Sequence, residues 1–147
     1  MTPDTLESKS MGRVTTEATI ENLKDLWDVE RGIIPASQAR RVTVPDAVVD
    51  TCVKMLSLPK HLIKQLGLGK TVRKRSSKGV IESYMYEPVR LTIQGRDCTM
   101  DVLEVPDNVP VLIGQMPQAH LDFVVDPCSR TLIGNPAHGG EHMYEMY

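Results

Sequence analysis

An apolar segment that ends in an Asp-Thr pair constrains this chain of 147 residues more than any other feature. Residues 41–49 are rich in Val and predict a strand, which carries Asp50 and Thr51 into a turn. A short helix is expected next, with Pro59 in its first turn and Gly67 at its end. A turn or a helix cap would by itself account for an Asp-Thr pair. Whether the pair has a further role therefore depends on the elements around it.

The rest of the chain has the pattern of short strands with a few small helices. Ten prolines, ten glycines and many Val, Thr and Ile residues favour strands and turns over long helices. We expect strands at residues 14–20, 41–49, 71–75, 80–86, 89–93, 98–105, 109–113, 123–125 and 130–133, and helices at residues 21–31, 57–67 and 115–121. The third and fourth of these strands are expected to form one hairpin, and the fifth and sixth another. With no repeat and no regular alternation of strand and helix, this predicts a mainly β fold with a closed or partly closed sheet.

One domain is expected, over residues 13–136, because a chain of this length has little room for a second core. Residues 1–12 are polar and unpatterned, which predicts a disordered leader. Residues 137–147 are expected to form a polar C-terminal tail with some aromatic residues.

Charge and cysteine content narrow the expected partners and location. The formal charge of −2 gives no general attraction to nucleic acid or to a membrane surface, so neither is expected as a partner. No apolar run approaches the roughly 18 residues that span a bilayer, and residues 1–10 lack the features of a secretory signal, which predicts a cytoplasmic location. Cys52, Cys98 and Cys128 form neither a CxxC pair nor an even disulfide set, which predicts free thiols. Neither a metal nor a cofactor is expected.

The order of the expected elements resembles the retropepsin-like (retroviral-type, clan AA) family of aspartic proteases. An Asp-Thr loop, a Leu-Ser-Leu-Pro segment with its helix, a hairpin with its tip at residues 76–79, and the strand end Leu112-Ile113-Gly114 before a helix follow the family's order. The resemblance covers residues 14–136 and implies the closed barrel of that family, with one domain per chain and short helices. The motif is degenerate, since the family's Asp-Thr-Gly reads Asp50-Thr51-Cys52 here.

The resemblance implies a homodimer that acts as an endopeptidase on peptides or proteins, because each chain of the family contributes one aspartate to a shared site. Two carboxylates about 3 Å apart share one proton, so that one activates a water molecule while the other protonates the substrate carbonyl. Asp50 would be this carboxylate, and Thr51 would brace the two loops across the dimer. The residues implied to bind substrate are Cys52, Val53, Ser77, Lys78, Gly79, Ile113 and Gly114.

Three departures from the family pattern favour an alternative. Cys52 places a thiol where glycine leaves room for substrate, and Val53 is larger than the usual alanine. Lys54, if it faces the aspartates, would favour ionisation of both carboxylates and remove the shared proton. The alternative is a catalytically silent homodimer of the same fold, which binds peptides or proteins in the same cleft.

Other residue groups suggest different chemistry less specifically. Cys52 and His61 would be a nucleophile and base only if the fold brought the helix back to the loop. His138, Glu141 and His142 could hold zinc if they were helical, although a solvated tail or a dimer-packing segment also explains them. A basic run without interleaved aromatic residues is interpreted as a charged hairpin edge rather than a nucleic-acid surface. It consists of Lys70, Arg73, Lys74, Arg75 and Lys78.

Overall fold

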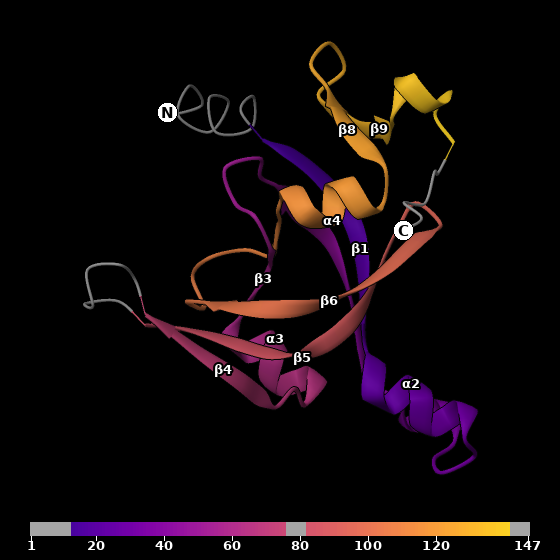
Figure 1. Cartoon of the computed structure of the whole chain (residues 1–147), viewed down its shortest axis with the longest axis vertical. Helices are drawn as coiled ribbons and strands as arrows, with labels where there is room; N and C mark the ends of the chain where they lie inside the picture. Colours follow the sequence, from indigo (N-terminus) through magenta and orange to yellow (C-terminus); the bar gives the residue numbers. More distant parts are fainter. Residues whose placement is uncertain (1–12, 76–81, 142–147) are drawn as a thin grey trace, which may run out of the picture.

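The computed structural model describes residues 13–75 and 82–141 (Figure 1). The elements are β1 (Val14–Asn22), α2 (Leu23–Glu30), the 3-10 helix η1 (Ala36–Gln38), β2 (Arg41–Val49), β3 (Leu56–Pro59), α3 (Lys60–Leu66), β4 (Lys70–Arg75), β5 (Glu82–Ile93), β6 (Arg96–Val105), β7 (Leu112–Ile113), α4 (Gln115–His120), β8 (Phe123–Asp126), β9 (Thr131–Gly134) and η2 (Pro136–His138). No helix among the described residues is long and apolar enough to cross a membrane.

Six strands close into a barrel. The main sheet has the order β1-β2-β7-β3-β6-β5-β4, and β1 also pairs with β5. The ring therefore runs from β1 to β5 and back, while β4 extends it beyond β5 (Figure 1). The prediction of a mainly β fold with a closed sheet and short helices is confirmed.

The strand that leads to Asp50 has the predicted bounds, Arg41–Val49. Its last three residues, 47–49, are buried, as expected for an apolar strand inside a barrel wall. The short strand β7 lies between β2 and β3, parallel to β2 and antiparallel to β3. This arrangement places Val49 at the end of β2 next to Ile113, which is 64 residues further along the chain and directly precedes Gly114.

Two of the wrong expectations about the elements concern β3 and β5. Residues 57–59 belong to β3 rather than to a helix, and the helix begins at Lys60, because Leu56–Pro59 is wholly buried between β6 and β7. The two expected hairpins share one continuous strand, β5, whose pairing with β6 shifts register between Tyr86 and Val89. Proline is tolerated in a strand at such an irregularity, so Pro88 does not end β5.

The barrel interior holds a single cluster of aliphatic side chains. Full burial of one such side chain stabilises the fold by roughly 1.5–3 kcal/mol, so this cluster fixes the strands around it. The largest wholly buried members are Ile20, Leu56, Leu58, Leu66, Leu91, Ile93, Ile113 and Leu121. Because Ile113 belongs to this cluster, the strand end next to Asp50 is anchored in the core.

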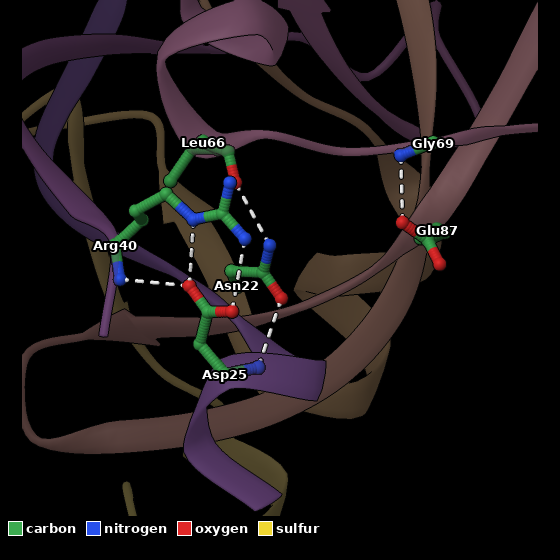
Figure 2. A network of polar contacts seen from close by, with 6 residues as sticks. All are labelled: Asn22, Asp25, Arg40, Leu66, Gly69 and Glu87. Carbon is green, nitrogen blue, oxygen red and sulfur yellow. Dashed lines mark hydrogen bonds and ion pairs between the residues drawn. The ribbon is translucent and has the colours of Figure 1, made fainter. Parts of the chain in front are cut away.

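A polar network fixes α2 and the following segment to the barrel (Figure 2). Asn22 caps α2 by accepting from the Asp25 N–H at 3.1 Å, and it donates to the Leu66 carbonyl at 2.8 Å. The buried Asp25 carboxylate accepts from Arg40 Nε at 2.8 Å and Nη2 at 3.0 Å. The Arg40 hydrogen bond holds the pKa of Asp25 below its ordinary value. Nearby, the Gly69 N–H donates to the Glu87 carboxylate at 2.6 Å.

Candidate active site

Asp50 sits in a short turn directly after β2. Its backbone N–H donates to the Ile113 carbonyl at 3.0 Å, which continues the pairing of β2 with β7. Its side-chain Oδ1 accepts from the Cys52 N–H at 2.9 Å, and its carbonyl accepts from the Val53 N–H at 3.3 Å. An aspartate that bonds the backbone two residues ahead forms an Asx turn, so the carboxylate is oriented by its own loop.

The loop lies against the segment that begins α4. The carbonyls of Val53, Lys54 and Met55 accept from the N–H groups of Gln115, Met116 and Gly114 at 2.8, 2.8 and 3.2 Å. A helix leaves its first N–H groups without partners inside the helix, and no side chain caps α4. The Asp50 loop therefore supplies these partners.

Gly114 is required by this close contact. A Cβ atom at position 114 would lie 2.5 Å from the Lys54 carbonyl carbon and 2.6 Å from the Met55 and Val53 oxygens. These are backbone atoms, so they cannot move aside as the end of a side chain can. The Leu112-Ile113-Gly114 pattern is thus explained by packing of β7 and α4 against the loop.

A hollow of about 490 Å³ opens at the Asp50 loop. Three loop residues and the apolar segment before β7 form much of its wall. The lining residues are Arg13, Val48, Val49, Asp50, Thr51, Cys52, Val109, Pro110 and Leu112. A half-buried carboxylate at an apolar wall can act on a ligand that lies in the hollow.

Some of the predicted site residues come together at this hollow and others do not. Asp50, Thr51 and Cys52 all line it. Val53 is half-buried beside them, and Gly114 lies behind the loop. The Ile113 side chain is wholly buried in the core, so what it gives to the site is the carbonyl that holds Asp50. Residues 77–79, which include the expected Ser77, Lys78 and Gly79, lie outside the described residues.

The loop accommodates Cys52 without backbone strain. Cys52 is not among the described residues with a positive φ, so its backbone does not need glycine. Its thiol is exposed and lines the hollow, where it takes up space. Lys54 is also exposed, and no ion pair joins it to Asp50 in the described part of the chain. The main consequence of the sequence Asp50-Thr51-Cys52 is therefore that the Cys52 side chain reduces the space in the hollow.

The other suggested constellations have different partners. His61 lies on α3, and its Nδ1 is 3.0 Å from Asp107 Oδ1. Its backbone N–H also donates to Asp107, and this bond is the main reason that the pKa of Asp107 is lowered. His138 Nδ1 lies 2.7 Å from Asp122 Oδ2, while His142 is outside the described residues. Among residues 13–75 and 82–141, no three His, Cys, Asp or Glu side chains gather as a metal site requires.

A second hollow, of about 580 Å³, also reaches Thr51. It is bounded by α4, by β8 and by the segment at η2, and β8 forms with β9 a separate two-stranded sheet next to α4 (Figure 1). Its lining residues are Thr51, Gln115, Gln118, Ala119, Asp122, Phe123, Val124, Val125, Asn135 and His138. Thr51 thus contributes to both hollows, with Asp50 lining only the first.

Sequence reasoning missed several residues of the site. Val109, Pro110 and Leu112 form its wall, and Gln115 contacts the loop. Residues 109–113 were predicted to be a strand, which is wrong for 109–111, since β7 spans only Leu112–Ile113, and periodicity alone does not show which residues of this segment meet Asp50. The position of Gln115 directly after Gly114, in the first turn of a helix, is the one signal that could have identified it.

Comparisons with known proteins find many similar solved structures, two of which are the following. EIAV protease complexed with the inhibitor HBY-793 is 15% identical, with a TM-score of 0.44 over 73% of this chain and 86% of that one. The retroviral protease-like domain of Ddi1 from Leishmania major is 12% identical, with a TM-score of 0.48 over 83% of this chain and 89% of that one. No family model and no curated protein matches the sequence. Likeness of this size carries no argument about function, which rests on the geometry of the Asp50 loop.

Proposed function

We propose that the protein is an aspartic endopeptidase that works as a homodimer, with one Asp50 from each chain. The observation that carries this proposal is the Asp50 turn itself, in which a half-buried carboxylate is fixed by the Cys52 N–H at the wall of a hollow that is lined by both polar and apolar residues. The hydrogen bond from the Cys52 N–H uses Oδ1, and in the part of the chain that the structure describes Oδ2 has no partner. Oδ2 is therefore available to a water molecule or to a second carboxylate.

Water activation at a carboxylate pair requires a second aspartate, which one chain does not offer at this hollow. Asp50 is the only carboxylate among its described lining residues. Two carboxylates that share one proton divide the roles of base and acid, so a second copy that presents its own Asp50 completes the chemistry. A symmetric dimer would bring the same loop from both chains to the twofold axis.

The second hollow is the surface that we assign to the partner chain. It begins at Thr51, and the β8–β9 hairpin beside it is held on the core by the buried Phe123 and Leu132. The half-buried Val124 and Val125 line this hollow. Packing of a second chain here would bury them and bring the two Thr51 residues close to the axis.

Sedimentation at micromolar concentration should give a species of twice the 16.4 kDa chain mass. Val124→Lys should weaken the dimer at least about 10-fold, because it places an unpaired charge in the interface. Ser37→Lys adds the same charge to the exposed η1 and should leave the dimer intact. A wild-type chain that remains a monomer up to 100 μM, roughly the weak end of specific association, would contradict the proposal.

Cys52→Gly should raise the rate of cleavage of unstructured peptides by about 10-fold or more. The reason is that the thiol occupies the hollow beside Asp50, while its backbone does not hold a strained conformation. The free energy of unfolding should fall by only about 0.4–1 kcal/mol, since glycine adds freedom to the unfolded chain. Steady-state kinetics on a peptide library, with a transition-state analogue as inhibitor, makes the measurement.

The silent homodimer is the alternative that the exposed Cys52 thiol favours. If neither the wild type nor Cys52→Gly cleaves peptides, although both are dimers that bind them, the silent form is the better account. Cys128→Gly is the matched control, because Cys128 is also exposed but lies in the β8–β9 turn. If the cleavage rate rose equally in both variants, the gain would not come from the space that Cys52→Gly opens in the hollow.

A further inference from the structure

Gln115 contacts the Asp50 loop through both its backbone and its side chain. Its backbone N–H donates to the Val53 carbonyl at 2.8 Å, and its side-chain Nε2 donates to the Thr51 carbonyl at 2.5 Å. The two acceptors lie on either side of Cys52. Gln115 is exposed, so burial in the core does not explain its place at the start of α4.

The Thr51 carbonyl belongs to the same peptide unit as the Cys52 N–H, which donates to Asp50 Oδ1 at 2.9 Å. A peptide unit is planar and rigid, so a bond that fixes its C=O also fixes the direction of its N–H. Hydrogen bonds in such a chain also polarise one another. The Gln115 amide is thereby linked to the Asp50 carboxylate through one peptide plane.

We propose that Gln115 is a positioning residue, which sets the orientation of the Asp50 carboxylate by holding the Thr51–Cys52 peptide. The inference deepens the proposed function, on which its kinetic consequence rests. Gly114 and Met116 bond the loop only through backbone N–H groups, which most substitutions leave in place. The Gln115 side chain is therefore the part of this contact that a mutation can remove without changing the backbone.

The first test measures the hydrogen exchange of the Cys52 amide and does not depend on activity. Gln115→Met removes the donor but keeps the length of the side chain, and the exchange of the Cys52 N–H with solvent, followed by NMR, should become about 10-fold faster. Gln115→Glu should have at least the same effect, because an ionised carboxylate only accepts hydrogen bonds. Gln115→Lys keeps a donor and should restore most of the protection. Gln65→Met on the exposed face of α3 is the matched control and should change nothing.

The second test is kinetic. Gln115→Met should lower kcat by about 10- to 100-fold with KM changed less than about twofold, since misplacement of a reacting group by 1 Å has effects of this size. Because Gln115 also lines the second hollow, the rates are compared at a protein concentration at which sedimentation shows both chains to be dimeric. If the wild type cleaves no peptide, the proposed function fails. The exchange rate of the Cys52 N–H then still tests whether Gln115 positions the loop. If the wild type cleaves and Gln115→Met changes neither kcat nor the Cys52 exchange rate, the positioning role is refuted and the proposed function stands.

Discussion

Asp50→Asn is expected to lower peptide cleavage by at least about 10³-fold, because in a homodimer one substitution removes both carboxylates of the pair. Asn cannot take a proton from water, although it preserves the size of the side chain and can still accept from the Cys52 N–H. Dimerisation and the free energy of unfolding should change little. Asp46→Asn is the matched control, since Asp46 is exposed on the same strand and does not line the hollow at Asp50.

Mixing the two chains distinguishes a shared site from two separate ones. When wild type and Asp50→Asn are present in equal amounts and pair at random, about a quarter of the dimers carry two aspartates. If both are needed, the rate per wild-type chain should fall to about half of its value without the variant. A rate per wild-type chain that does not change would show that each chain works alone, and activity that survives Asp50→Asn would move the chemistry to another group.

The position of Asp50 could be predicted because the signal is local. An apolar strand followed by Asp-Thr specifies where the chain leaves the sheet, and the strand bounds 41–49 are confirmed. The closed sheet also follows from many short strands separated by turns. The motif resemblance places Gly114 near the loop. The physical reason is that the backbone at positions 53–55 lies too close to Gly114 to leave room for a side chain.

Elements whose identity depends on distant contacts could not be predicted. The run at residues 56–58 has no clear period, and a short buried strand cannot be told from a helix on periodicity alone. Burial against β6 and β7 decides in favour of a strand. Likewise Pro88 indicates a break in the sequence, whereas pairing on both sides keeps β5 continuous through an irregular register. The wall formed by Val109 and Pro110 depends on β7 lying between β2 and β3, which no local pattern encodes.

Arg40→Met is expected to lower the free energy of unfolding by about 2–4 kcal/mol, because it leaves a buried carboxylate without its partner. The Asp25 side chain is only 7% exposed, whereas that of Arg40 is 49% exposed, so the loss should be somewhat smaller than for a fully buried pair. Arg41→Met is the matched control. The Arg41 side chain is 66% exposed and lies 4.0 Å from Glu21, so its loss should cost less than about 0.5 kcal/mol.

Removing both charges should be less harmful than removing Arg40 alone. Asp25→Leu with Arg40→Met replaces the pair by apolar side chains, which leaves no unpaired charge in the interior. Urea unfolding at pH 7 should therefore place the double variant between Arg40→Met and the wild type. A double variant that is less stable than Arg40→Met would show that the carboxylate is satisfied by other groups, such as the Arg40 backbone N–H at 3.0 Å.

The same pair predicts the sign of a pH effect. The pKa of Asp25 is lowered in the folded chain, mainly by the hydrogen bond from the Arg40 side chain, so the folded state holds its proton less tightly than the unfolded state. The resulting stabilisation is complete above the unfolded pKa of about 4 and is lost as the pH falls through the lower folded value. The gap in unfolding free energy between wild type and Arg40→Met should thus narrow from pH 7 to about pH 2.5. A gap that stays constant would mean that Arg40 stabilises α2 by packing of its side chain near Gly67, and not through the charge of Asp25.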